Sequence, residues 1–195
     1  MAIKAVIFDY YGVLLKNTHG VRLEKLRREA PERAEEFSAV NRAADKGILA
    51  LEDARRRMAE LFGISYEQLL HEYASGEVPN EMLITFIEQN LKPNYTIGLL
   101  SNSTGRAQLD APFAPGRLDT IFDTVVSSGE IGVIKPQPEI YQYAAAKLGV
   151  HPEECIMVDD IEAFCIGAQD TGMRAVHFTD TEDAIRGIQA CLTKS

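Results

Sequence analysis

Cysteine is scarce in this chain of 195 residues, and the few cysteines present follow no binding pattern. Cys155, Cys165 and Cys191 are odd in number and show no CxxC spacing. Both features argue against a disulfide framework and against a zinc site. Because Cys155 and Cys165 lie among apolar residues, we expect them in the core of a protein from a reducing compartment.

The sequence also has no apolar run long enough to cross a membrane, and its N-terminus lacks the layout of a signal peptide. Positive charge is outweighed, because 20 Lys and Arg residues stand against 29 Asp and Glu residues and leave a formal net charge of −9. Such a surface repels nucleic acids and anionic membranes. We therefore expect a cytoplasmic protein that binds neither, and the sequence indicates nothing about its oligomeric state.

Short apolar runs alternate with helical patterns over most of the chain. The expected strands cover residues 5–8, 95–100, 121–127, 155–158 and 175–178. The expected helices cover residues 81–89, 139–148, 163–171 and 181–192. Strands that alternate with helices predict a parallel sheet in a doubly wound, Rossmann-like α/β fold.

Residues from about 21 to 75 differ from this pattern, because Arg, Glu and Ala dominate and no strand signal occurs. Leu51, Ala54, Met58 and Leu61 form one apolar stripe at helical spacing. This stretch predicts several short helices inserted after the first strand. We therefore place an α/β core at residues 1–15 and 79–195 and a helical insertion at residues 16–78.

Polar residues follow three of the predicted strands directly. Asp9, Ser101 and Asp159 take these places, and each alone could be a helix cap. The carboxyl ends of parallel strands meet at one edge of a sheet, where ligands bind. The adjacent carboxylates of Asp159 and Asp160 repel each other unless a cation or a donor lies between them. Mg²⁺ suits such oxygen ligands, and Lys135, before the helix at 139–148, could neutralise further negative charge.

Four segments, in this order, resemble the motifs of the haloacid-dehalogenase-like hydrolase superfamily. The segments are residues 8–14, 99–103, 134–141 and 156–160. The resemblance extends over about residues 3–178, and each motif has the expected strand context. It identifies the helical insertion as the small α-helical cap of this superfamily, which screens the site from water.

The resemblance implies a role for each motif residue. Asp9 is the nucleophile that forms an aspartyl-phosphate, and Lys135 stabilises the charge of the transferring group. Ser101, followed by Asn102, binds the phosphoryl group.

The resemblance also implies a Mg²⁺ ion. Its ligands are the carboxylates of Asp9 and Asp159 and the main-chain carbonyl of Tyr11. Asp160 is either a further ligand or lies just behind the ligands.

Two positions depart from the phosphatase pattern. Tyr11 stands where phosphatases of the superfamily usually carry the acid/base Asp, and a Tyr with a pKa near 10 is a poor base at neutral pH. Phe164 stands where related hydrolases often have Asn. The Asp-x-Tyr-Gly pattern around Tyr11 is instead similar to 2-haloacid dehalogenases, which need no metal and usually lack the double acid.

We therefore predict a Mg²⁺-dependent phosphatase for a small phosphorylated metabolite. The alternatives are a 2-haloacid dehalogenase and a phosphatase-like binding or regulatory protein without catalysis. The substrate is expected to be a small, anionic molecule. Arg22, Arg27 and Arg28 could reach it, although a solvated helix surface is the favoured interpretation of these three side chains.

Overall fold

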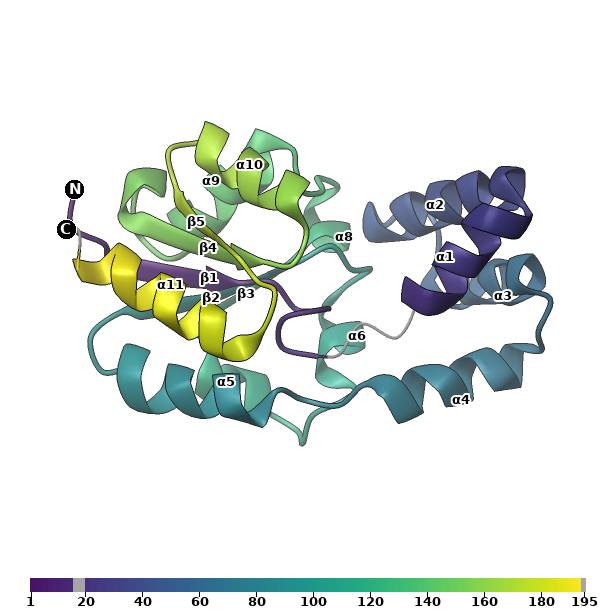
Figure 1. The fold of residues 1–195 in the computed structure, drawn as a ribbon, viewed down its shortest axis with the longest axis horizontal. Coiled ribbons are helices and arrows are strands. Elements are labelled where there is room, and N and C mark those ends of the chain that lie inside the picture. The colour runs from purple at the N-terminus through teal and green to yellow at the C-terminus, as the bar shows by residue number, and fades with distance from the viewer. Residues whose placement is uncertain (16–19, 194–195) are drawn as a thin grey trace.

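The computed structural model describes residues 1–15 and 20–193. A parallel sheet and its helices form one part of the molecule, and a block of helices forms the other (Figure 1). The elements in chain order are β1 (Ala5–Phe8), α1 (Gly20–Glu29), α2 (Pro31–Asp45), α3 (Leu51–Phe62), α4 (Tyr66–Gly76), α5 (Glu81–Phe86), the π-helix η1 (Ile87–Leu91), β2 (Thr96–Ser101), α6 (Arg106–Asp110), α7 (Arg117–Ile121), β3 (Thr124–Ser127), α8 (Ser128–Ile131), α9 (Pro138–Lys147), the 3₁₀ turn η2 (Pro152–Glu154), β4 (Cys155–Asp159), α10 (Glu162–Asp170), β5 (Arg174–His177) and α11 (Thr181–Thr193).

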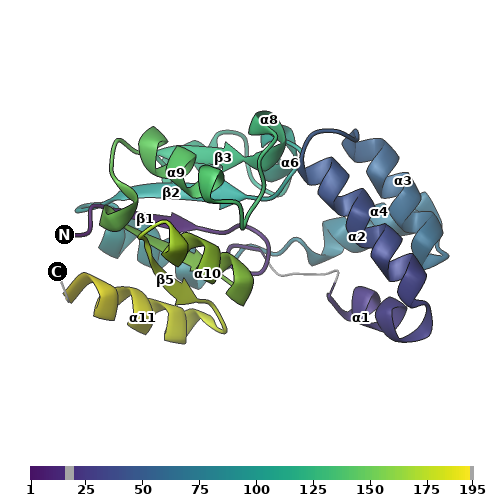
Figure 2. The same cartoon turned by 90° about the horizontal axis from the view of Figure 1, so that it is seen from above.

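The sheet has five parallel strands in the order β3-β2-β1-β4-β5, as the doubly wound prediction requires. Strand β1 lies at its centre, where Phe8 is paired with Leu99 of β2 and with Val158 of β4. Helices α9 and α10 cover one face, and α5 and α11 cover the other (Figure 1, and seen from above in Figure 2). The α/β prediction is therefore confirmed.

Alternate residues of β1 pack against opposite faces of the sheet. Val6 and Phe8 belong to the apolar cluster that includes α5 and α11. Ala5 and Ile7 belong to the cluster formed with α9. Because helices bury both faces of the sheet, all four residues of β1 are apolar, and apolar and polar residues do not alternate along the strand. Cys155 and Cys165 are buried, as expected, and all three cysteines are free.

The strand expected at 121–127 is shorter and begins later. Helix α7 ends at Ile121, and β3 begins at Thr124. Asp123 intervenes, because its amide donates to the Ile97 carbonyl and its carboxylate accepts from the Ile97 amide, both at 2.8 Å. The short helices α6, α7 and α8 were not expected. The remaining elements agree with the predicted ranges to within about two residues.

Helices α1 to α4 have an apolar cluster of their own. The predicted stripe on α3 is confirmed for Ala54, Met58 and Leu61, which are buried in this cluster, whereas Leu51 is half-buried. The block lies at one end of the α/β part, and both chain termini lie at the far end (Figure 1). The predicted boundaries of the insertion at 16 and 78 stay a prediction, and its first residues, 16–19, lie outside the described residues. No helix within 20–193 is both long and apolar enough to span a membrane.

Two connections hold the block against the sheet. On one side, the linkers pair, with a bridge between Leu15 and Pro79. On the other side lies a contact that we call the α2–α8 seam, formed by Asp45, Gly47, Ser128 and Gly129. The Ser128 hydroxyl donates to the Asp45 carbonyl at 2.5 Å.

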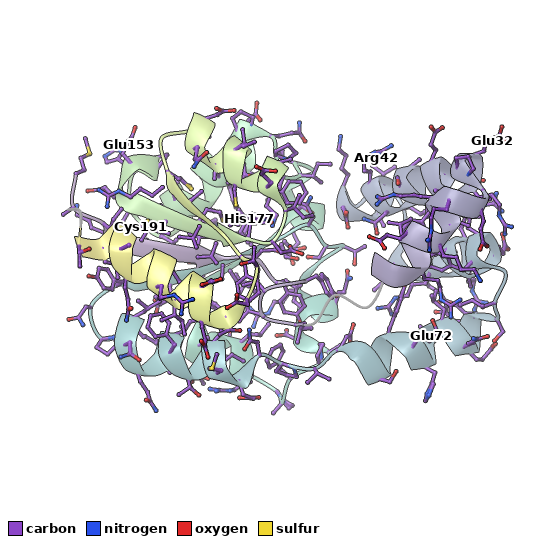
Figure 3. All side chains as sticks on the ribbon, in the orientation of Figure 1. Glu32, Arg42, Glu72, Glu153, His177 and Cys191 are labelled. Atoms are coloured by element: carbon purple, nitrogen blue, oxygen red, sulfur yellow. The ribbon has the colours of Figure 1, made fainter. Side chains whose placement is uncertain are left out.

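At Gly47 and Gly129 the two backbones of the seam meet without a side chain between them. Gly47 has a φ of +68°, and a Cβ there would lie 2.5 Å from the Gly129 carbonyl oxygen. Only glycine fits such a contact. Arg42, one turn before the seam, marks the end of α2 that faces the α/β part (Figure 3).

Candidate active site

The motif residues from distant parts of the sequence meet at the carboxyl edge of the sheet. The Lys135 ammonium lies 2.6 Å from Asp9 Oδ1 and 2.6 Å from Asp159 Oδ2, and the three side chains are buried. Asp9 follows β1 and Asp159 ends the adjacent strand β4, so the strand pairing sets their separation. Lys135 comes from the loop before α9 and closes the cluster from the opposite side.

Neighbouring groups fix the position of Lys135. Its amide donates to Asn102 Oδ1 at 2.8 Å, and Asn102 Nδ2 donates to its carbonyl at 3.2 Å. Its ammonium lies 5.0 Å from the centroid of the Phe164 ring, a cation–π distance. Phe164, unexpected from the family pattern, therefore covers the ammonium. Asn102 holds the Lys135 backbone, and its role in phosphate binding stays a prediction.

Burial makes the ionisation of this cluster unfavourable. It raises the pKa of the Asp9 carboxyl to about 7, although the Lys135 ammonium lowers that pKa, and the charge of Asp159 raises it further. Burial and Asp159 likewise raise the pKa of Asp160. Burial lowers the pKa of Lys135, but the two carboxylates more than offset this, so its pKa lies above the ordinary value. The cluster therefore contains more carboxylates than cations.

The donor set fits a hard divalent cation. Oxygen atoms of Asp9, Asp159 and Asp160 all lie within 4.8 Å of one another. Asp160 Oδ1 is buried and has no hydrogen-bond partner among the described residues. Gly12 permits this arrangement, because its φ is +92° and a Cβ there would lie 2.1 Å from Asp160 Oδ2. Three convergent carboxylates, one with an unpaired buried oxygen, are the kind of ligand set that Mg²⁺ takes.

The strand ends also hold the acidic loop in place. Asp159 Oδ1 accepts from the Ile161 amide at 2.9 Å. His177 Nε2 lies 3.0 Å from the Asp160 carbonyl oxygen, at the end of β5 (Figure 3). These contacts fix the main chain of the loop and leave the Asp160 carboxylate to face the cluster.

Ser101 ends β2 beside Asp9. Its side chain is 1% exposed, and its Oγ has no hydrogen-bond partner among the described residues. A buried, unpaired hydroxyl is costly unless a ligand satisfies it. The observation suits a group that binds an oxyanion.

Tyr11 is close to the cluster but is engaged elsewhere. Its hydroxyl accepts from Gln108 Nε2 at 3.1 Å, and its ring packs edge-on against Tyr10. Burial raises the pKa of Tyr11 to about 12, and the charge of Glu77 contributes. The phenol therefore stays protonated at neutral pH, as the sequence predicts.

A cavity of about 300 Å³ lies between the α/β part and the helical block. Its floor contains Asp9, Ser101 and Lys135, and its roof comes from helices α1 to α4 and from the residue that follows α4. The roof residues are Leu23, Phe37, Asn41, Ala44, Asp45, Leu51, Ala54, Arg55, Met58, Tyr73 and Glu77. The space is large enough for a small metabolite.

The roof of the cavity contains an arginine, but it is none of the three considered from the sequence. Arg22 pairs with Glu72, and Arg27 and Arg28 lie on the exposed surface. Arg55 instead faces the cavity, where its Nε is buried without a hydrogen-bond partner among the described residues. Arg55 lies four residues after Leu51 and therefore on the same face of α3, and this spacing is the signal that could have identified it.

The chain is similar in sequence to known phosphatases. Over 111 residues the chain is 30% identical to pyrophosphatase PpaX of Bacillus cereus, a match to 56% of this chain and about half, 51%, of that relative. Phosphatase MT3486 of Mycobacterium tuberculosis is 26% identical over 195 residues, which cover 90% of this chain and 87% of the relative.

Solved structures show the same fold. A predicted HAD-like family hydrolase from Porphyromonas gingivalis has a TM-score of 0.76 and 25% identity, and each chain is covered in full, 100%. The magnesium complex of the HAD family enzyme BT-2542 from Bacteroides thetaiotaomicron has a TM-score of 0.70 and 23% identity, with 91% of this chain and 93% of that chain covered. A family model for haloacid dehalogenase-like hydrolases matches residues 3–170. The chain therefore belongs to the haloacid dehalogenase-like hydrolase family.

Proposed function

We propose that this hydrolase is a Mg²⁺-dependent phosphatase that acts on a small phosphorylated metabolite through an aspartyl-phosphate at Asp9. The observation that carries the proposal is the buried cluster of Asp9, Asp159 and Asp160 around Lys135, with Asp160 Oδ1 unpaired. Halide displacement by a carboxylate without a metal does not require the second and third acids. The phosphatase and pyrophosphatase names of the relatives, and the magnesium complex of a structural neighbour, support the same conclusion.

Each residue has a chemical task in this reaction. A carboxylate oxygen of Asp9 attacks phosphorus, and Lys135, already 2.6 Å from Asp9, neutralises negative charge at the reacting centre. The unpaired Ser101 hydroxyl donates to a phosphoryl oxygen. Asn102 keeps Lys135 in place through the hydrogen bond from the Lys135 amide, and it follows Ser101 directly in the chain. Bound to Asp9, Asp159, Asp160 and the Tyr11 carbonyl, Mg²⁺ would supply positive charge that offsets the charge of the phosphoryl group.

The test is Mg²⁺-dependent phosphate release by the wild-type chain and by Asp9→Asn. We expect the wild type to hydrolyse aryl phosphates only when Mg²⁺ is present and the variant to keep less than about a hundredth of that rate, since losing a covalent nucleophile removes the path. Asp53→Asn, the same change on an exposed residue of α3, is the control and should retain activity. An Asp9→Asn variant that keeps more than about a tenth of the rate would exclude Asp9 as nucleophile.

A second candidate is 2-haloacid dehalogenation, and Tyr11 is the observation that favours it. The Tyr stands in the Asp-x-Tyr-Gly pattern and contacts the cavity. Halide release from 2-chloropropionate, measured with and without EDTA, separates the two candidates. Metal-independent chloride release without phosphate release would favour the dehalogenase. Because the chain belongs to a hydrolase family and keeps Asp9 and Lys135, a binding protein without catalysis is disfavoured.

A further inference from the structure

Phosphatase chemistry at Asp9 also needs a general acid and base, and no residue described so far fills that role. The departing alkoxide needs a proton, and the water that later attacks the aspartyl-phosphate must lose one. Tyr11 occupies the position from which the superfamily usually supplies this group. Its hydroxyl accepts a hydrogen bond from Gln108, and a phenol is a poor base at neutral pH.

We propose that Asp45, on the last turn of α2, is the general acid and base of this site, so that the helical block supplies the group which the loop after β1 lacks. The proposal rests on the proposed phosphatase function. It names a residue that sequence reasoning did not find.

The fold fixes Asp45 at the cavity. Asp45 lines the same space as Asp9 and Lys135, and its carbonyl accepts the 2.5 Å hydrogen bond from Ser128 across the α2–α8 seam. The contact of Gly47 with Gly129, two residues further on, prevents any side chain from separating the two parts there. Asp45 is therefore the roof carboxylate whose backbone is tied to the α/β part.

Its side chain is also oriented. Asn41, one turn earlier on α2, donates from Nδ2 to Asp45 Oδ2 at 2.8 Å. This hydrogen bond occupies one oxygen of the carboxyl group and leaves Oδ1 as the atom for proton transfer. Residues i and i+4 of a helix lie on one face, which explains how Asn41 reaches it.

The electrostatic surroundings suit both halves of the task. Burial raises the pKa of Asp45 to about 7, and the charge of Lys135, close enough to act on it, lowers that pKa in part. Both protonation states are then populated at neutral pH, which is the condition for one group to act first as acid and then as base. The charged and titratable groups that face the cavity with Asp45 are Asp9, Tyr11, Arg55, Tyr73, Glu77 and Lys135.

The proton balance closes over two steps. In the first, Asp9 forms its bond to phosphorus, the ester P–O bond breaks, and the leaving oxygen takes the proton of the Asp45 carboxylic acid. In the second, the Asp45 carboxylate takes a proton from water, the water oxygen bonds to phosphorus, and the P–O bond to Asp9 breaks. Alcohol and hydrogen phosphate leave, and Asp45 is again protonated.

The decisive experiment compares two esters that differ in how much they need a proton. Phenyl phosphate has a basic leaving group, whereas 2,4-dinitrophenyl phosphate has an acidic one. We expect Asp45→Asn to lower kcat/KM for phenyl phosphate by about 10²–10⁴ and to change it far less for the dinitrophenyl ester. With the dinitrophenyl ester, phosphorylated Asp9 should accumulate and be detected by mass spectrometry after acid quenching, since water activation is lost.

Three further variants show whether the effect is that of an acid and base. Asp45→Glu should retain the leaving-group response of the wild type. Tyr11→Asp, added to Asp45→Asn, should restore much of the phenyl phosphate rate by returning a carboxyl group to the usual position. Glu77→Gln, the matched loss of another roof carboxylate, should affect both esters equally. If Asn is not tolerated at position 45, Asp45→Ser serves the same comparison.

The outcomes separate this inference from the function on which it rests. An equal effect of Asp45→Asn on both esters, or no effect on either, overturns the assignment of Asp45 while Asp9-dependent release by the wild type still stands. A wild-type chain that releases phosphate from neither ester overturns the proposed function and the inference together. A selective loss with phenyl phosphate, rescued by Tyr11→Asp, establishes Asp45.

Discussion

Replacing Asp9 by Asn should stabilise the metal-free protein at neutral pH while it removes catalysis. Burial holds the pKa of the folded Asp9 carboxyl at about 7, above its ordinary value of 3.8. Ionisation of Asp9 in the folded state is therefore unfavourable relative to the unfolded chain. An Asn has the same shape and no charge, so the variant avoids this cost.

The pKa difference gives the magnitude. A rise from 3.8 to about 7 corresponds to about 4 kcal/mol, an upper bound because Asp9 shares Lys135 with Asp159. The pKa of Asp9 is higher in the folded than in the unfolded state, so protonated Asp9 favours the folded state. This contribution to the free energy of unfolding is present in full below a pH of about 4 and is lost as the pH rises through about 7. The free energy of unfolding of the wild type should fall over that window in EDTA, relative to that of Asp9→Asn.

Urea unfolding at pH 5 and pH 8, in EDTA and in MgCl₂, measures the difference. At pH 8 in EDTA we expect Asp9→Asn to be the more stable protein by about 1–4 kcal/mol. Mg²⁺ bound to the ionised carboxylates, as proposed above, should reverse the order. Asp53→Asn, an exposed control, should follow the wild type. A variant less stable than the wild type at pH 8 in EDTA would refute the electrostatic account of the cluster.

Three other changes test the rest of the site. Asp160→Asn should weaken Mg²⁺ binding by about 10-fold or more in calorimetry, and an unchanged affinity would remove Asp160 from the metal site. Tyr11→Asp in the wild-type background should raise phosphatase turnover by only a small part of the roughly 10²–10⁴ that acid/base catalysis provides, because Asp45 already acts; a full gain there would argue against Asp45. Arg55→Met should raise KM by about 10-fold or more for phosphate esters whose alcohol carries a carboxylate, with kcat nearly unchanged, whereas neutral esters should show no such increase.

The central part of the site was predictable from the sequence because strand ends determine it. An apolar run that ends in Asp9 and another that ends in Asp159 must bring the two carboxylates together if the strands are neighbours in a parallel sheet. Lys135 was predictable as a motif residue. Its position between the two acids depends on Asn102 and on the fold of the loop before α9, which no local pattern reveals.

The roof of the cavity was not predictable in the same way. Arg55, Arg56 and Arg57 are consecutive in sequence, yet Arg56 and Arg57 form exposed ion pairs with residues of α2 and α3 while Arg55 faces the cavity. Helical phase distinguishes them only once it is known which face of the block meets the sheet. Asp45 had the appearance of one more charge on a solvated helix, because its main-chain carbonyl, and not its side chain, accepts the hydrogen bond from Ser128 across the seam. Such contacts leave little trace in side-chain chemistry.

The α2–α8 seam joins the helical block to the α/β part at the end of α2, where Asp45 lines the cavity. The paired linkers at Leu15 and Pro79 and the seam at Gly47 and Gly129 are the places where the two parts touch through main chain. Asp45 belongs to the seam itself, whereas Arg55 lies on the next helix, α3, at the cavity. The position of Asp45 is therefore set by contacts with the α/β part, and the position of Arg55 is set by the packing of α3 inside the helical block.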